Sequence, residues 1–233
     1  MEQIIVLDVK FQFRDRTETI HPTVLLDEKD MVLVDCGYTG SLPNLEFAME
    51  EAGLDPAQLT AIFITHHDHD HMGALAAFKR KYPPIKIIAG ETETPYITGE
   101  KKSLRITQAE ALQRILPEEQ QAFGQAFLHI LRSVEPAQVN LTVRGGDVLP
   151  WCGGCIVLAT PGHTPGHLSL YLKAKHTLVA GDAAVSESGT LAIANPQFTL
   201  DMENAQKSIQ AIQNYDAESI ICYHGGIYQK KFD

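Results

Sequence analysis

Residues 65–71 read Thr65-His66-His67-Asp68-His69-Asp70-His71, so that four histidines and two aspartates fall within seven positions. Three later stretches continue this chemistry: Thr160-Pro161-Gly162-His163-Thr164-Pro165-Gly166-His167, Gly181-Asp182, and Tyr223-His224-Gly225-Gly226. Together these stretches contain seven of the ten histidines of the chain. Neutral imidazole is the commonest metal ligand in proteins, and carboxylates are hard oxygen ligands. The pattern therefore indicates a metal site.

Each of these stretches follows a short apolar run that is typical of a buried strand. The runs are Ala61–Ile64, Ile156–Ala159, Thr177–Ala180 and Ile220–Tyr223. A strand holds its last residue rigidly, while the turn that follows lets several side chains converge on one point. We therefore expect four strand ends to deliver the ligands into one cleft.

The order Thr-His-x-x-x-Asp-His, Thr-Pro-Gly-His-Thr-Pro-Gly-His, Gly-Asp and a late His-Gly resembles the metallo-β-lactamase fold superfamily. The resemblance covers nearly the whole chain, from Leu33-Val34-Asp35 to His224. It implies an α/β fold of the αββα sandwich type, in which two mixed β-sheets lie face to face with helices outside. It also implies a hydrolytic cleft with two metal ions along one edge.

The resemblance also implies roles for individual residues. A first metal would be bound by His66, Asp68 and His163, a second by Asp70, His71 and His224, and Asp182 would bridge the two. Asp35 and His167 would support these ligands through hydrogen bonds. We expect two divalent metal ions, with zinc as the first choice and iron or manganese as alternatives.

This chain departs from the commonest family pattern at one position. Asp68 stands where the second histidine of His-x-His-x-Asp-His is expected, so the motif becomes His-x-Asp-x-Asp-His. An aspartate adds charge and a hard oxygen, which favours iron or manganese relative to an all-histidine zinc site. A shift in register would instead make His67 or His69 the ligand.

The chain of 233 residues suits one domain over 1–233. Besides the four strands before the ligand stretches, strands are predicted at Ile4–Phe13, Thr23–Leu26, Met31–Val34, Ile85–Ala89 and Leu168–Leu172. Helices are predicted after Ser41, over Met72–Tyr82 and over Met202–Asn214. A helical insertion is predicted at about 91–139, with a capping box at Thr107–Glu110 and an apolar stripe of Phe123, Phe127, Ile130 and Leu131 for core packing.

The formal net charge of −10 argues against nucleic acid as a partner, because phosphate binding needs a basic surface. The N-terminal residues do not form a signal peptide, and no apolar stretch approaches the ~20 residues of a membrane span. We expect a cytoplasmic protein with a small-molecule substrate and no nucleic-acid or membrane partner. The oligomeric state is not predicted.

The stretch Trp151-Cys152-Gly153-Gly154-Cys155 resembles the thioredoxin Trp-Cys-Gly-Pro-Cys motif. In thioredoxins a helix begins at this motif and activates the first cysteine. Here the apolar run Ile156–Leu158 follows, so the two glycines indicate a tight turn between strands. Redox chemistry and a zinc clip are the alternatives to this interpretation.

The leading functional hypothesis is a metal-dependent hydrolase that acts on an ester, thioester, lactone or amide-like bond. Hydroxide bridging the two metals would attack the carbonyl, and Asp70 would hold the second metal and handle the proton. The alternative is a non-haem iron oxidoreductase of the same fold, similar to the persulfide dioxygenases, which the extra oxygen ligand of Asp68 supports.

Overall fold

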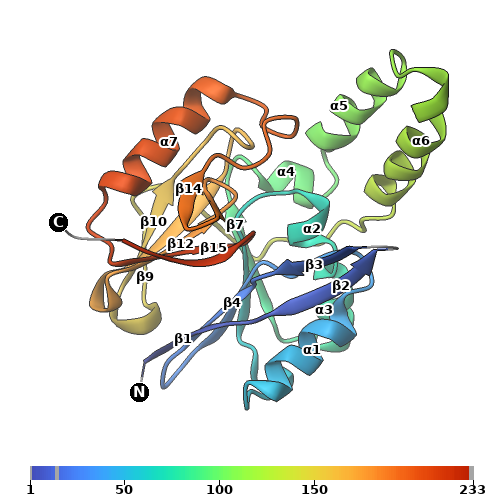
Figure 1. Ribbon diagram of the computed structural model, residues 1–233. Helices are drawn as coiled ribbons and strands as arrows, with labels where there is room; N and C mark the ends of the chain where they lie inside the picture. The colour runs from blue at the N-terminus through green and yellow to red at the C-terminus, as the bar shows by residue number, and fades with distance from the viewer. Residues whose placement is uncertain (1, 14–15, 231–233) are drawn as a thin grey trace.

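Two six-stranded mixed β-sheets form the centre of the computed structural model, which describes residues 2–13 and 16–230 (Figure 1). The first sheet contains, in spatial order, β1 (Gln3–Val6), β4 (Thr23–Leu26), β5 (Met31–Val34), β6 (Ala61–Ile64), β7 (Lys86–Gly90) and β8 (Leu141–Val143). The second contains β16 (Gly226–Gln229), β15 (Ser219–Cys222), β12 (Thr177–Gly181), β11 (Leu168–Leu172), β10 (Cys155–Ala159) and β9 (Val148–Leu149). Two hairpins lie outside these sheets, β2 (Val9–Phe13) with β3 (Arg16–Ile20) and β13 (Val185–Glu187) with β14 (Thr190–Ala192).

The central strands are apolar on both faces because both faces are buried. In β5, Val34 packs in the core between the two sheets, together with Val157 and Leu170 of the second sheet. The preceding residue, Leu33, points the other way and packs in the core beneath the helices with Leu45. Alternate residues of a strand face opposite sides, so an unbroken apolar run is the expected sequence of such a strand.

Helices cover the outer face of each sheet. On the first sheet, α1 (Leu42–Glu51) and α3 (Leu75–Lys81) share one hydrophobic core, and on the second sheet α7 (Met202–Asn214) packs through Ile209 and Ile212. The prediction of an αββα sandwich is therefore confirmed. In the described part of the chain, no helix combines the length and the hydrophobicity that crossing a lipid bilayer requires.

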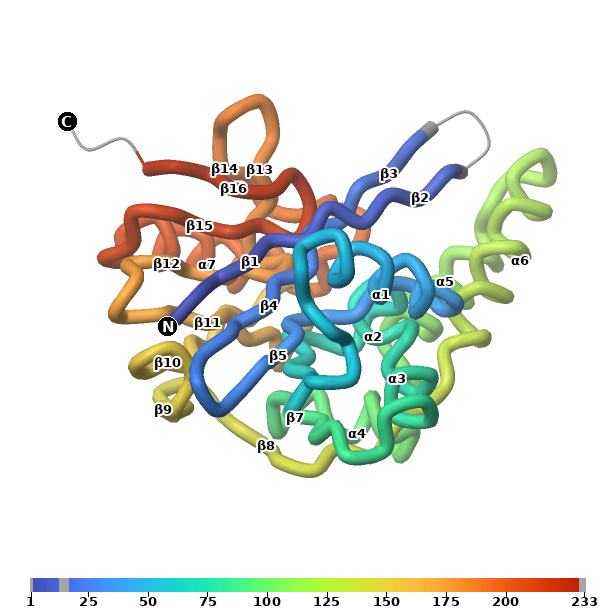
Figure 2. Tube along the Cα trace, turned by 90° about the horizontal axis from the view of Figure 1, so that it is seen from below, coloured from blue at the N-terminus to red at the C-terminus, as the bar shows by residue number. Residues whose placement is uncertain are grey.

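The segment between β7 and β8 is helical, as predicted, with α4 (Thr94–Ile97), α5 (Leu104–Gln113) and α6 (Glu118–Arg132). The antiparallel pair α5–α6 projects from the body of the molecule in both views (Figures 1 and 2). Leu131 packs inside this pair, but Phe123 is 77% exposed and Ile130 is 46% exposed. The predicted core stripe is thus correct for Leu131 and wrong for these two residues, because a projecting pair of helices has no sheet to cover its outer side.

Several predicted boundaries are wrong for local reasons. The run 4–13 forms two strands, since the chain leaves the first sheet after β1 and the Leu7 N–H donates to the Pro22 carbonyl. The helix predicted over 72–82 is divided into the short α2 (His69–Met72) and α3 by Gly73 and Ala74. Thr107 lies inside α5, which begins after Ser103, whose side chain accepts from the Arg105 N–H.

The cysteine motif forms a connection between paired strands. β9 and β10 are antiparallel, and the 3₁₀ turn η2 (Trp151–Gly153) joins them. Burial raises the pKa of Cys152 to about 11 and that of Cys155 to about 12, so both are thiols at neutral pH. No helix follows the motif, and this agrees with the hairpin interpretation rather than with a thioredoxin site. The other 3₁₀ turns are η1 (Pro56–Gln58) and η3 (Lys173–Lys175).

Candidate metal centre

The predicted ligands meet at one edge of the sandwich because neighbouring strands end there. β5, β6 and β7 run parallel, as do β12 and β15, so their carboxyl ends lie on the same side of each sheet. Asp35 follows β5, His66 follows β6, and Asp182 follows β12. The loop after β6 leads into α2, which carries Asp70 and His71. The structure therefore brings together residues that are up to 158 positions apart, from His66 to His224.

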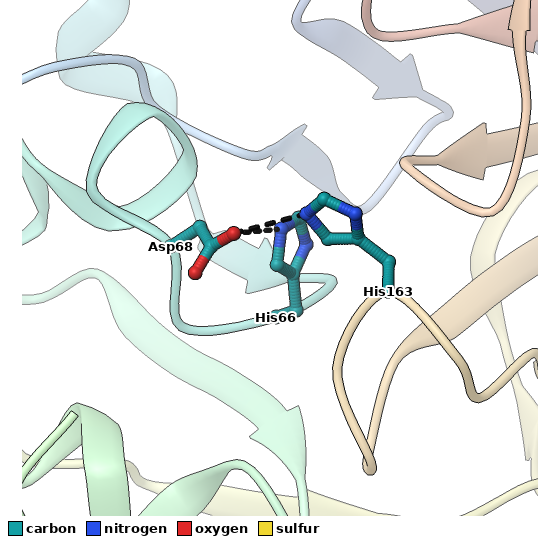
Figure 3. A group of neighbouring side chains, drawn as sticks. All are labelled: His66, Asp68 and His163. Carbon is teal, nitrogen blue, oxygen red and sulfur yellow. Dashed lines mark hydrogen bonds and ion pairs between the residues drawn. The ribbon is translucent and has the colours of Figure 1, made fainter. Parts of the chain in front are cut away.

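His66, Asp68 and His163 form the first group of candidate ligands (Figure 3). The Asp68 Oδ2 atom lies 3.0 Å from His163 Nε2 and 3.5 Å from His66 Nε2. All three side chains are buried and point toward one another. They come from the loop after β6 and the loop after β10, so the group spans both sheets.

Asp70, His71 and His224 form the second group. The Asp70 Oδ2 atom lies 3.3 Å from His224 Nε2 and 3.8 Å from His71 Nε2. The His71 side chain is fully buried, whereas that of His224 is 28% exposed. This group therefore has an open side through which a small molecule can approach.

Asp182 lies between the two groups. Its Oδ2 atom is 3.4 Å from His163 Nε2 in the first group, and its Oδ1 atom is 3.3 Å from His71 Nε2 in the second. The two oxygens of one carboxylate thus face different sets of ligands. This is the position expected of a residue that bridges two cations.

The carboxylate of Asp35 orients two of the candidate ligands, His71 directly and His66 through Thr65. It accepts hydrogen bonds from the Thr65 N–H at 2.9 Å, from the Thr65 hydroxyl at 2.8 Å, and from His71 Nδ1 at 2.8 Å. Because the Thr65 hydroxyl donates to Asp35, it accepts from His66 Nδ1, 2.9 Å away. Both rings therefore direct Nδ1 toward these partners and Nε2 toward the cluster, where a bound metal ion would take the Nε2 lone pair.

His167 supports Asp182 through the backbone. Its Nε2 atom accepts a hydrogen bond from the Asp182 N–H at 3.0 Å, and its Nδ1 atom pairs with the Thr160 hydroxyl at 2.9 Å. Burial and the neighbouring His66 and His163 hold the pKa of His167 well below its usual value, so the ring stays neutral and can accept. The hydrogen-bonding position predicted for this residue is the one the structure gives it.

Three buried ligand atoms lack a hydrogen-bond partner within the described residues: His66 Nε2, His71 Nε2 and Asp182 Oδ1. Leaving a buried polar atom without a partner costs roughly 1–3 kcal/mol. These atoms belong to groups whose ligand atoms all lie within 4.8 Å of one another. Imidazole nitrogens and carboxylate oxygens converging in this way fit divalent metal ions.

The charges of the cluster are strongly coupled. Burial alone would lower the pKa of His71, but the carboxylates of Asp182, Asp35 and Asp70 outweigh it and raise this pKa well above its usual value. In the same way, Asp182 and Asp70 raise the pKa of His224 against the effect of burial. Without a metal ion, protons therefore occupy the positions that a cation would take.

One residue at the centre was not anticipated from the sequence. The buried guanidinium of Arg105, from α5, donates to Asp68 through Nη2 at 2.6 Å and through Nε at 3.2 Å. Its Nη2 atom is also 3.4 Å from His163 Nε2. Burial would raise the pKa of Asp68, but Arg105 and the histidines hold it well below its usual value. No spacing in the sequence connects Arg105 to Asp68, because the pairing depends on how α5 folds back.

The two remaining histidines of the 65–71 stretch have other partners. His67 Nδ1 is in very short contact with the buried carboxylate of Glu93, a residue that the sequence analysis also missed. His69 lies at the rim between the rings of Tyr38 and Phe127, each 5.6 Å away. Neither histidine belongs to a group of described residues whose geometry could hold a metal ion.

Comparison with known proteins agrees with this geometry. The sequence profile of the metallo-beta-lactamase superfamily matches residues 16–224. The chain belongs to this superfamily. Its relatives include metallo-hydrolases, and the protein is an enzyme of this superfamily.

Two relatives and two solved structures illustrate the range of similarity. The chain is 28% identical over 205 residues to the probable metallo-hydrolase YflN of Bacillus subtilis strain 168, covering 83% of this chain and 75% of that protein. It is 30% identical over 201 residues to a hydroxyacylglutathione hydrolase of Enterobacter sp. strain 638, covering 85% of this chain and 59% of that protein. A metallo-beta-lactamase family protein from Thermus thermophilus has a TM-score of 0.74 at 23% identity, covering 97% of this chain and 74% of that one. An archaeal superfamily member from Sulfolobus tokodaii has a TM-score of 0.70 at 19% identity, covering 98% and 82%.

The roles of Asp182 and Asp35 can be separated by their effect on bound metal. Asp182→Ala should lose most of the metal, because a carboxylate that faces both groups is removed and two cations would then repel each other more strongly. Asp35→Asn should retain the ions with about 10–100-fold weaker affinity, since it acts only by orienting ligands. Elemental analysis and chelator competition measure both. Asp216→Asn, at a side chain that is 86% exposed, is the matched control, and full metal content in Asp182→Ala would disprove the bridging role.

Arg105→Met should destabilise the metal-free protein and be rescued by metal. The substitution removes the guanidinium from the buried Asp68 carboxylate and leaves it only its histidine neighbours. Breaking a buried ion pair typically costs about 3–5 kcal/mol, and a bound cation would restore the missing positive charge. Thermal unfolding with and without zinc tests this. Arg80→Met is the control, because the Arg80–Glu135 pair is on the surface and its loss should change little. An equal loss of stability in the presence and absence of zinc would contradict this role for Arg105.

Metal binding should release protons and weaken on acidification. The raised pKa values of His71 and His224 keep these rings protonated in the metal-free protein, and a ligand must give up its proton to bind. Affinity should therefore fall as the pH is lowered through the raised pKa values of the two rings, which regain their protons there. Calorimetric zinc titrations in buffers of different ionisation enthalpy count the protons. An affinity independent of pH would show that the rings are already neutral.

Proposed function

We propose that this protein is a dinuclear metal-dependent hydrolase that cleaves an ester, thioester, lactone or amide-like bond in a small molecule. Zinc is the proposed metal, and iron or manganese are the alternatives. We further propose that the protein acts in the cytoplasm, without a nucleic-acid or membrane partner. The net charge of −10 supports the absence of a nucleic-acid partner.

The placement of Asp182 carries this proposal. One of its oxygens faces His163 in the first ligand group and the other faces His71 in the second. A carboxylate in that position can hold two cations a few ångströms apart, which is the arrangement of two-metal hydrolytic sites. A mononuclear centre would leave one of the two groups without a function.

The bound ions and the Asp70 carboxylate would have different roles in hydrolysis. When bound, the two ions would lower the pKa of a water molecule and polarise the substrate carbonyl. The Asp70 carboxylate, whose side chain is 14% exposed, lies where it can hold one ion and accept a proton. Although burial acts against it, His69, His71 and His224 lower the pKa of Asp70, so the carboxylate is ionised at neutral pH.

The wall above the cluster supports a substrate with an apolar portion. Phe127 of α6 lies against His69 and against Phe198 of the loop before α7. Arg105 stacks over the same Phe198 ring at 5.2 Å, so this wall contains both rings and one cation. Among the candidate bonds, the similarity to hydroxyacylglutathione hydrolase supports a thioester.

A second candidate function rests on the composition of the first ligand group. His66, His163 and Asp68 are two histidines and one carboxylate, the set found in non-haem iron oxygenases. An iron-dependent oxidation of a thiol-derived substrate is therefore the alternative. The same three residues would hold a zinc ion in the hydrolase, so this ligand set is compatible with both candidate functions.

Turnover and metal content together test the proposed function. The purified protein is loaded with zinc or iron, analysed for metal, and assayed against ester, thioester, lactone and amide panels and in an oxygen electrode. We expect two zinc ions per chain and hydrolysis without oxygen uptake, with Asp70→Asn slower by at least about 100-fold. His129→Ala, at an exposed position on α6, is the control. Oxygen uptake by the iron-loaded protein without hydrolysis would support the alternative instead.

A further inference from the structure

A cavity lies between the ligand loop and the helices α4, α5 and α6. Its volume is about 200 Å³, and it is lined by His67 and His69 of the ligand loop, Tyr96 of α4 and Arg105 of α5. Ligand pockets for drug-sized molecules measure about 300–1,000 Å³, so this one accommodates a small group or one end of a larger molecule. Arg105 lines the cavity and also pairs with Asp68, which makes it a shared wall between the cavity and the metal centre.

The charge of this cavity is opposite to that of the protein. Lys101, Lys102 and Arg105 line it, and none of its described lining residues is acidic, in a chain with a net charge of −10. Arg105 is paired with Asp68, and Lys102 is paired with Glu110. Lys101 forms no ion pair with any described residue and lies over the Tyr96 ring at 5.8 Å. One positive charge at the cavity is therefore uncompensated.

One of the histidines that line the cavity is held rigidly and has an unpaired polar atom. The backbone N–H of His67 donates to the Glu93 carboxylate at 3.0 Å, and His67 Nδ1 is in very short contact with the same carboxylate. The two contacts fix the orientation of the ring. The carboxylate of Glu93 is anchored in turn by the Thr164 hydroxyl at 2.9 Å and the Gly166 N–H at 2.8 Å. The Nε2 atom of His67 is buried and has no hydrogen-bond partner within the described residues. The ring also stacks on that of Tyr96 with 4.5 Å between the ring centres.

The rest of the cavity is apolar. Besides the two lysines, its lining includes Met72, Ile106, Leu131 and Val134. A ligand that satisfies both halves must carry a negatively charged end and a short apolar chain. A single unpaired lysine matches a single negative charge, which favours a carboxylate over a doubly charged phosphate.

We propose that this cavity binds a carboxylate at the end of a short apolar chain, with Lys101 and Lys102 as the cationic partners and the His67 ring as part of the wall. The binding site itself does not depend on the proposed function. A further consequence does rest on that function: in a hydrolase, the cavity would select substrates that carry an anionic group on the side of the cleaved bond that faces α5.

Binding of hexanoate to the zinc-loaded protein tests the site without requiring turnover. Calorimetry should give a dissociation constant on the order of 1 mM, as expected for so small a ligand. The neutral analogue hexanol should bind at least about tenfold more weakly. Lys101→Met with Lys102→Met should weaken hexanoate binding by about tenfold. Lys86→Met, an exposed lysine at the opposite end of β7, should leave it unchanged.

Saturation-transfer and histidine-ring NMR give a second measurement. Bound hexanoate should shift the His67 ring signals in the zinc-loaded protein while the zinc content remains constant. Equal affinity for hexanol, or unchanged hexanoate binding in the double lysine variant, would overturn the proposal. So would hexanoate binding that is insensitive to the lysines and disappears when zinc is chelated, because the carboxylate would then bind the metals. An inactive protein that binds hexanoate as expected would refute the proposed function and leave this site standing.

Discussion

The carboxylate of Asp35 is the constraint on which the cluster depends. It follows β5 with a φ of 61°, a left-handed conformation that few residues other than glycine adopt. From there it accepts hydrogen bonds from Thr65 and from His71, and through Thr65 it also determines the orientation of His66. The two rings consequently present the same nitrogen to the centre. A strained backbone is tolerated at this point because three hydrogen bonds overdetermine the side chain.

The excess of negative charge explains how the surrounding elements are arranged. Asp68 and Asp182 are buried and Asp70 lies beside them with 14% of its side chain exposed, and buried carboxylates need compensation by nearby positive charge. Protons on His71 and His224 provide part of it in the metal-free state, and metal ions would provide the rest. Arg105 compensates Asp68 from outside the sheets. The helical segment between β7 and β8 thus contributes directly to the electrostatics of the centre and also forms its wall.

Local sequence predicted the buried strands well and the short elements poorly. Thr23–Leu26, Met31–Val34 and Ala61–Ile64 match β4, β5 and β6 residue for residue, because strands buried on both faces are uninterrupted apolar runs. Strands β8 and β14 were not predicted, since each is only three residues long and largely exposed or half-buried. The start of the helix predicted over 72–82 was wrong, because the ligand loop forms a separate short helix there, α2.

The sequence by itself determined the superfamily and indicated the candidate ligands, because both follow from residue types in a fixed order after recognisable strands. Whether His67 belongs to the metal cluster depended on a partner, Glu93, which no spacing identifies. The same is true of Arg105, whose contact with Asp68 joins a helix of the projecting pair to the loop after β6. Such pairings are between residues far apart in the chain, and they exist only once the helices pack against the sandwich. Tertiary structure alone therefore decided which charges face one another, and with them the cavity beside the centre.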